Sequence, residues 1–364
     1  MFLGFGVLAW SLLASAPLLQ QDFEKNAGGW IAFGPSCSIG VTRDPAIVRN
    51  GDASLEFKYD EPRGRPPAAV LPIRQPLDKM RSVRFWIMSP QATAAAMFIS
   101  EKQGGRYISV FWLEPRTWQR VELVPEDFVL GRQADDPPDP DGRLDLEEIR
   151  AFGILDIGPM FAKALGESDF PIAINDRSGS HSIYLDDFEI STETPAWRKA
   201  RPPLQIDDFS HPQLTWFTLG GADLKRDVTH KVLEADAMQM EYQQLDDRLI
   251  LVSHPMTSGD FTGAHSLAFE IASDKPAQIA ISIEEESGAR YDSDVRVPGG
   301  NKALHMDIPL NMFEASDNGP RDPDGKLDLD RLRSTTLLDF TGAETQEVVV
   351  NTLRIGDLRF LKAK

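Results

Sequence analysis

The sequence predicts an all-β protein made of two tandem β-sandwich domains with short helical insertions. Three observations support this prediction: the length of 364 residues, a period-two alternation of apolar and polar residues, and a long internal repeat. The length suits two domains of roughly 150 to 180 residues each. Alternating segments bounded by Gly, Pro, Asp and Asn clusters are typical of the strands and turns of a sandwich.

The internal repeat shows that each half of the chain is one copy of the same domain. Asp139–Leu146 reads Asp-Pro-Asp-Gly-Arg-Leu-Asp-Leu and recurs as Asp322–Leu329 with Lys in place of Arg. Upstream, Ser82–Tyr107 aligns without a gap on Ser266–Tyr291. A repeat of this period sets the architecture before any local motif is considered.

The N-terminus has the pattern of a secretory signal peptide. An apolar stretch runs from Phe2 and ends at Ala14-Ser15-Ala16, which is a small-residue cleavage pattern. The stretch is too short to span a bilayer, so the protein is not expected to be membrane-spanning. A buried N-terminal segment is the alternative. We therefore expect an exported protein, located in the periplasm, on the cell surface or outside the cell.

These signals divide the chain into four parts. The signal peptide covers residues 1–16, and the first sandwich covers 17–192. A linker over 193–204 contains three prolines, which stiffen it and cannot continue a helix or a central strand. The second sandwich covers 205–364.

Two segments of the first domain have a helical pattern, namely Leu144–Phe152 and Met160–Leu165. Asp145 is the expected N-cap of the first. The acidic segment before it, Asp139–Gly142, has some spacing of an EF-hand calcium loop, but Pro137 stands where the first carboxylate is required. We therefore interpret this segment as a turn.

Composition and motifs exclude several functions. Acidic residues outnumber basic ones 56 to 38, and the net charge of -18 would repel nucleic acid. The chain lacks a Gly-x-Ser-x-Gly elbow, a His-Glu-x-x-His helix and a Gly-rich phosphate loop. We therefore do not expect an enzyme. A carbohydrate-active enzyme with paired carboxylates stays open as an alternative, because sandwich folds host such activities.

Comparison of the two copies separates core positions from positions that need another explanation. In one strand, Val83, Phe85 and Ile87 match apolar residues of the second copy, so we expect them in the core. Three aromatic residues of opposite parity have polar counterparts: Trp86 (Glu270), Phe98 (Ser282) and Trp112 (Arg296). The outer face is therefore aromatic in the first copy and charged in the second.

Trp86, Phe98 and Trp112 are the candidate ligand-binding residues, and we call them the aromatic triplet. Further polar and aromatic candidates share their parity: Trp118, Arg84, Arg120 and Glu122. Aromatic rings cover the apolar faces of sugar rings while charged groups bind their hydroxyls. The alternative is that the triplet packs against the other domain or another protein.

Three motifs carry a family resemblance. They are the first strand Asp22–Glu24 followed by Gly29-Trp30, the turn Arg49–Leu55, and the closing strand Tyr184–Phe188. Together they resemble the galactose-binding-like jelly rolls, which include bacterial carbohydrate-binding modules and the complex I intermediate-associated protein family. The resemblance implies that both sandwiches are jelly rolls.

The resemblance also implies a structural calcium ion between the first strand, the following turn and the last strand. Four oxygen donors match these places: Asp22, Glu24, Asp52 and Asp187. Such donors suit calcium. Exposed carboxylates at strand ends are the alternative interpretation.

The sequence thus predicts an exported, non-catalytic protein that binds a polysaccharide or glycoconjugate through the aromatic face of the first domain. A structural or assembly protein of the cell envelope, docking another protein through that face, is the alternative hypothesis.

Overall fold

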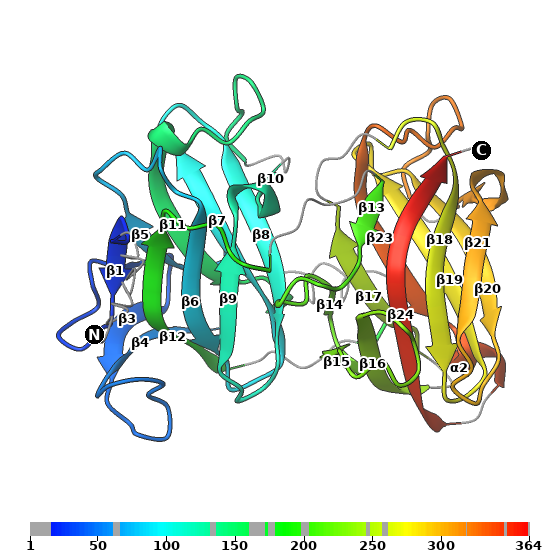
Figure 1. The fold of residues 1–364 in the computed structure, drawn as a ribbon, viewed down its shortest axis with the longest axis horizontal. Coiled ribbons are helices and arrows are strands. Elements are labelled where there is room, and N and C mark those ends of the chain that lie inside the picture. The colour runs from blue at the N-terminus through cyan, green and yellow to red at the C-terminus, as the bar shows by residue number, and fades with distance from the viewer. Residues whose placement is uncertain are drawn as a thin grey trace, which may run out of the picture.

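The structure, a computed structural model, consists of two β-sandwiches placed side by side (Figure 1). It describes residues 16–60, 66–131, 136–159, 172–173, 179–197, 204–244, 248–256, 261–317, 319–345 and 348–362. The predicted signal peptide, apart from Ala16, and the predicted helix at Met160–Leu165 lie outside the described residues. The predicted linker is described at its two ends.

The first sandwich contains two six-stranded antiparallel sheets. Sheet 1 has the order β3 (Cys37–Thr42), β4 (Ser54–Asp60), β12 (Ser180–Ser191), β6 (Ser82–Met88) and β9 (Gln119–Leu123), with β1 (Leu19–Gln21) paired to β12. Sheet 2 has the order β10 (Val129–Leu130), β8 (Arg106–Leu113), β7 (Thr93–Glu101), β11 (Ile149–Asp156), β5 (Ala68–Pro72) and β2 (Ile31–Phe33).

The second sandwich repeats this topology. Sheet 3 has the order β15 (Ala222–Asp227), β16 (Ala237–Gln244), β24 (Val349–Lys362), β18 (Ala264–Ser273) and β21 (Leu304–Pro309), with β13 (Gln205–Asp207) paired to β24. Sheet 4 has the order β14 (Phe217–Thr218), β17 (Ile250–Pro255), β23 (Leu332–Asp339), β19 (Ala277–Glu285), β20 (Arg290–Val297) and β22 (Glu314–Ala315). Each strand thus corresponds to the strand twelve places earlier, which confirms the prediction of two tandem sandwiches.

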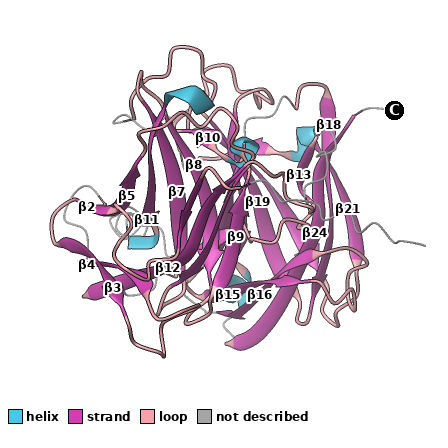
Figure 2. Cartoon of the chain, turned by 60° about the vertical axis from the view of Figure 1, so that its left-hand side comes forward, coloured by secondary structure: helices cyan, strands magenta, loops and turns pink. Residues whose placement is uncertain are grey.

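In the part of the chain that the structure describes, the labelled helices are few and short (Figure 2). They are the 3₁₀ turns Pro125–Asp127, Leu146–Glu148 and Leu310–Met312, and the α-helix α2 (Thr341–Thr345). Among the residues that the structure describes, no helix has the length and apolar character needed to cross a bilayer.

The helix predicted over Leu144–Phe152 is wrong. Only one 3₁₀ turn forms, and β11 begins at Ile149. Asp145 precedes that turn but makes no side-chain capping hydrogen bond. The pattern was misleading because β11 lies inside sheet 2 and is apolar on both faces, with Phe152 in the core and Leu155 packed on the second sandwich.

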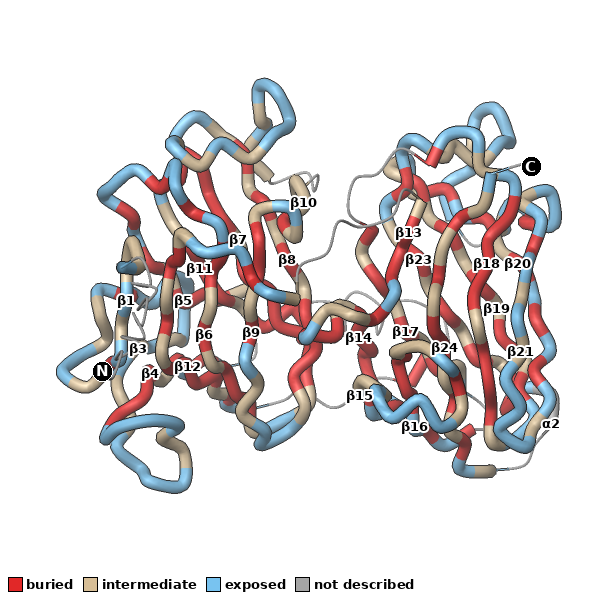
Figure 3. Tube along the Cα trace, in the orientation of Figure 1, coloured by how far each residue is buried: buried red, intermediate tan, exposed pale blue. Residues whose placement is uncertain are grey.

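Each sandwich buries its core between its two sheets, and the exposed segments lie mostly in the loops (Figure 3). Val83, Phe85 and Ile87 are buried as predicted. A tryptophan closes each core next to the first strand. The Trp30 Nε1 donates to Gln21 Oε1 at 2.7 Å, and Trp216 Nε1 donates to Asp207 Oδ2 at 2.9 Å.

The two sandwiches share a packed interface on the outer face of sheet 2. Ala94, Ala96, Trp112 and Ile157 of the first sandwich belong to the same buried cluster as Leu214, Phe217 and Leu219 of the second. The Trp112 backbone N–H also donates to the Leu214 carbonyl at 2.9 Å. The segment between β13 and β14 therefore packs directly against sheet 2.

Candidate functional site

The structure separates the aromatic triplet. Trp86 lies on β6 in sheet 1, whereas Phe98 and Trp112 lie on β7 and β8 in sheet 2. All three point away from the core of the first sandwich, but from opposite sides of it. The expectation of one platform is therefore wrong. Strand parity distinguishes the inward side from the outward side, but it does not assign a strand to a sheet.

Trp112 is not available to a ligand. It is 2% exposed, because the second sandwich covers it. Trp112 therefore contributes to the interface between the domains, which was the alternative interpretation. The equivalent residue of the second copy, Arg296, is charged. The difference is explained by the packing of Trp112 against the second sandwich.

Phe98 is half-buried on the outer face of sheet 2 and packs on its own sheet. Its cross-strand partner is Gly153, and a Cβ on Gly153 would lie 2.1 Å from Phe98 Cζ. The Arg106 guanidinium carbon lies 6.0 Å from the Phe98 ring centroid. The ring therefore fills the space that the glycine leaves.

The other five candidates come together on the outer face of sheet 1, and we call them the Trp86 face: Arg84, Trp86, Trp118, Arg120 and Glu122. Pairing of β6 with β9 places Arg84 opposite Glu122 and Trp86 opposite Arg120. Trp118 directly precedes β9. Cross-strand neighbours of this kind lie about 5 Å apart. The structure thus assembles this group from strands that are distant in sequence.

One end of the Trp86 face is a network of charged groups. Arg84 forms ion pairs with Glu122, with Glu189 at 3.5 Å and with Glu193 at 3.7 Å. The Trp197 Nε1 donates to Glu122 Oε2 at 2.9 Å. Arg84 and Glu122 are therefore already partnered within the chain, and they position the strands beside Trp86.

The other end is more open. Trp86 is half-buried, with Asp186 on one side and the exposed Arg120 on the other. The Arg49 guanidinium carbon lies 4.1 Å from the Trp86 ring centroid, which is a cation–π contact. The Trp118 Nε1 donates to the Ile47 carbonyl at 2.9 Å. The loop before β4 therefore borders the ring.

Asp186 holds this loop in place and was missed by the sequence analysis. Its carboxylate accepts hydrogen bonds from Ser54 Oγ at 2.8 Å and from the Asn50 N–H at 3.1 Å. It is fully buried, and burial raises its pKa. Arg49 was missed as well, because its contact with Trp86 joins segments far apart in the sequence.

The four predicted calcium ligands surround one corner of the sandwich, but the carboxylates of Asp22, Glu24 and Asp187 accept N–H groups. The Glu24 carboxylate accepts the Asp52 N–H at 3.0 and 3.1 Å, and Asn50 Nδ2 donates to Asp187 Oδ2. Asp22 Oδ1 accepts the Glu24 N–H at 3.2 Å. Within the described part of the chain, no three His, Cys, Asp or Glu residues are placed to hold a metal ion. As placed, these side chains do not fit calcium, and calcium binding stays a prediction.

The repeated acidic segment forms a turn, as predicted, and a buried carboxyl group holds it. Asp139 accepts the Asp141 and Gly142 N–H groups, each at 2.9 Å, while Glu101 accepts the Asp145 N–H at 2.5 Å. Burial, the largest cause, raises the pKa of Glu101 to about 7. The pKa of Asp139 falls to about 2 despite desolvation, because Tyr107 and the turn donate to it.

The second sandwich has the same arrangement with Glu285, Tyr291 and Asp322. Glu285 accepts the Asp328 N–H at 2.6 Å, and burial raises its pKa. Tyr291 donates its hydroxyl to Asp322. Since both copies contain this arrangement, we assign it to loop structure.

No protein-family model matches the chain, and no curated protein matches its sequence. Among solved structures, the chain is similar to a family 11 carbohydrate-binding module from Clostridium thermocellum in complex with a β-1,3-1,4-mixed-linked tetrasaccharide. The identity is 18%, the match covers 45% of this chain and 98% of the other, and the TM-score is 0.36.

A tandem pair of family 22 carbohydrate-binding modules from Paenibacillus barcinonensis Xyn10C is similar over 96% of this chain and 98% of its own, with 11% identity and a TM-score of 0.32. An exo-β-agarase matches 44% of this chain with 26% of its own length, at 15% identity and a TM-score of 0.35. The first two are carbohydrate-binding modules, the group named by the sequence resemblance.

Proposed function

We propose that the protein is an exported, non-catalytic saccharide-binding protein whose first domain contacts its ligand through the Trp86 face. The observation that supports this proposal is the position of Trp86. Its half-buried ring lies on the outer face of sheet 1, opposite the exposed Arg120 of β9 and beneath the Arg49 guanidinium. An aromatic face beside charged groups suits the apolar side and the hydroxyls of a sugar ring.

The second domain lacks this combination at the equivalent positions. Glu270 stands in place of Trp86 on β18, and Ala268 stands in place of Arg84. Asp307 of β21 lies opposite Ala268, as Glu122 lies opposite Arg84. Stacking on an aromatic ring is therefore expected from the first domain alone.

Arg49 determines how a sugar can approach. Because its guanidinium lies over the Trp86 ring, a pyranose that stacks on this ring must displace Arg49. A cation–π contact at an exposed site is worth about 0.5 to 1 kcal/mol, so the displacement costs little. Removing Arg49 should therefore favour stacking.

Affinity electrophoresis tests the proposal, with mixed-linked β-glucan, xylan and agarose as the polysaccharides. Trp86→Ala should weaken binding by about five- to ten-fold, the typical worth of an aromatic contact. Arg49→Ala should tighten binding by about two- to five-fold. Phe33→Ala is the matched control, since Phe33 is 61% exposed on sheet 2.

Equal retardation of the wild type and Trp86→Ala would remove the Trp86 face from the proposal. If no polysaccharide retards the wild type, the result would favour the alternative, in which this face docks a protein of the cell envelope. Release of reducing sugar from any of these polymers would contradict the non-catalytic assignment. Fractionation of cells that express the full chain tests export.

A further inference from the structure

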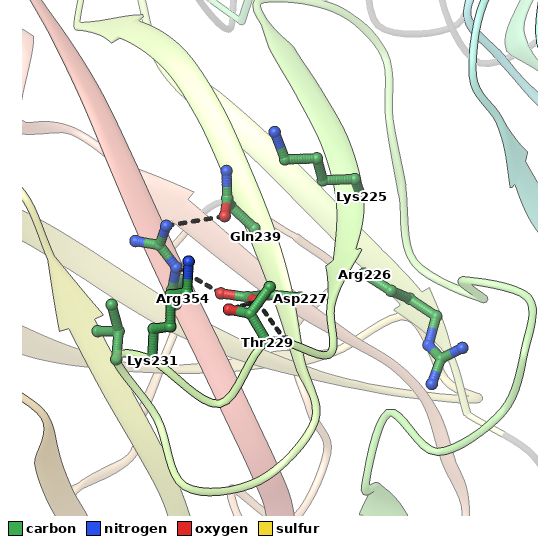
Figure 4. Close-up of a pocket in the computed structure, with 8 residues that line it drawn as sticks. Lys225, Arg226, Asp227, Thr229, Lys231, Gln239 and Arg354 are labelled. Carbon is green, nitrogen blue, oxygen red and sulfur yellow. Dashed lines mark hydrogen bonds and ion pairs between the residues drawn. The ribbon is translucent and has the colours of Figure 1, made fainter.

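The outer face of sheet 3 carries a pocket of about 370 Å³ in the second domain (Figure 4). Strands β15, β16 and β24 form its floor, and the loop after β15 forms its side. Its lining includes four basic residues and one acidic residue: Lys225, Arg226, Lys231, Arg354 and Asp227. In a chain with a net charge of -18, this concentration of cations is a local exception.

Arg354 forms the floor of the pocket and is held rigidly. Its Nε donates to Asp227 Oδ2 at 2.8 Å, and its Nη2 donates to Gln239 Oε1 at 2.8 Å. Its Nη1 donates to Asn301 Oδ1 at 3.2 Å. The Arg354 and Asp227 side chains are 15% and 10% exposed. A guanidinium has five N–H groups, so two have no partner among the described residues.

The acceptors of the pocket are already occupied. Asp227 Oδ1 accepts both the N–H of Thr229 at 3.0 Å and its hydroxyl at 2.6 Å. Gln239 Oε1 accepts Arg354, and Gln239 Nε2 donates to Glu241 at 2.7 Å. Each hydroxyl of a neutral sugar carries an O–H donor, which needs an acceptor when it is buried. The pocket therefore favours a ligand rich in acceptors.

Two lysines at the rim add further donors. Lys225 pairs with Glu241 at 3.1 Å, and its side chain is 49% exposed. Lys231 is exposed and has no ion-pair partner in the part of the chain that the structure describes. Arg226 extends away from the other lining residues in Figure 4 and pairs with Asp236. Arg354, Lys225 and Lys231 are therefore the groups that can meet an anion.

The pocket is specific to the second domain. The row of cross-strand neighbours Lys225, Gln239 and Arg354 corresponds to Gly40, Glu56 and Tyr184 in the first domain. No cation occupies that row of the first domain. The outer face of sheet 1 thus carries an aromatic site in the first copy. The outer face of sheet 3, the equivalent sheet of the second copy, carries a cationic one.

We propose that this pocket binds the carboxylate of an acidic saccharide, a uronate residue, with Arg354 at the floor and Lys225 and Lys231 at the rim. The preference for an oxyanion follows from the donors of the pocket. The choice of a saccharide as the source of the oxyanion rests on the proposed function. The volume of the pocket, about 370 Å³, lies in the usual range for small-ligand sites.

Isothermal titration calorimetry with trigalacturonate and its carboxyl-reduced, neutral counterpart tests this proposal in the full chain. Trigalacturonate should bind, and the neutral counterpart should bind at least about ten-fold more weakly, the worth of one hydrogen bond to a charged group. Lys231→Ala and Lys225→Ala should each weaken binding several-fold, and added salt should weaken it further. Lys326→Ala removes an exposed charge from another loop of the same domain and should change nothing.

Arg354→Gln should abolish binding, and a melting curve checks its folding. If it does not fold, the two lysine variants decide the matter, since both side chains lie at the rim. Equal binding of the two trisaccharides, or unchanged binding by both lysine variants, would overturn the proposal. If inorganic sulfate binds to the pocket and trigalacturonate does not, the saccharide assignment would be overturned. Trp86→Ala should leave trigalacturonate binding at the pocket intact, so the two sites can fail separately.

Discussion

Replacing Glu101 by Gln should change how the stability of the first sandwich depends on pH. Glu101 is 5% exposed, and burial raises its pKa from 4.5 to about 7. Gln resembles the protonated form. Its Oε1 can accept the Asp145 N–H, and its Nε2 can donate to Asp139. The variant therefore keeps the loop contacts and removes the ionisation.

The sign and size of the effect follow from the pKa. Between pH 4.5 and about 7, the folded protein binds more protons at Glu101 than the unfolded chain does. Wild-type stability therefore falls as the pH rises through this window. One pKa unit corresponds to about 1.4 kcal/mol, so the wild type loses about 3 kcal/mol at this residue. Glu101→Gln should exceed the wild type by about 1 kcal/mol at pH 5 and by about 3 kcal/mol at pH 8.

Urea unfolding of both proteins at pH 5, 6, 7 and 8 measures this difference. Glu147→Gln is the control, because it removes a carboxylate that is exposed on the same loop. Glu285→Gln should act in the same direction on the second sandwich, where burial also raises the carboxyl pKa. A constant difference between Glu101→Gln and the wild type across this range would refute the reasoning.

Three further predictions concern the interface, sheet 2 and the calcium corner. Trp112→Ala should destabilise the protein by about 3 to 5 kcal/mol and split a single calorimetric transition into two, because Trp112 joins the sandwiches; an unchanged transition would contradict this. Gly153→Ala should lower Tm, since its Cβ would overlap Phe98, and Phe98→Ala should restore part of the loss; no rescue would contradict the packing. If calcium occupies the corner that the resemblance implies, EDTA should lower Tm and Asp52→Asn should remove that response; an EDTA effect that survives Asp52→Asn would place the metal elsewhere.

The sequence by itself determined the duplication, the two-sandwich class and the inward-facing residues. Phe85 and Ile87 were predicted in the core because a strand alternates its sides every residue, and this property is local. Arg84, Trp86, Arg120 and Glu122 were also predicted to face outward, for the same reason. The helix over Leu144–Phe152 was wrong, because a strand that is apolar on both faces loses its period of two.

Only the tertiary structure decided which outer residues share a surface. Trp86 and Trp112 have the same parity, yet strand pairing places them on opposite sides of one sandwich. The second domain then covers Trp112, and Arg49 covers part of Trp86. The basic pocket likewise depends on β15, β16 and β24 lying side by side. The physical reason is that sheet membership and domain packing depend on contacts between distant segments, whereas alternation depends on neighbouring residues.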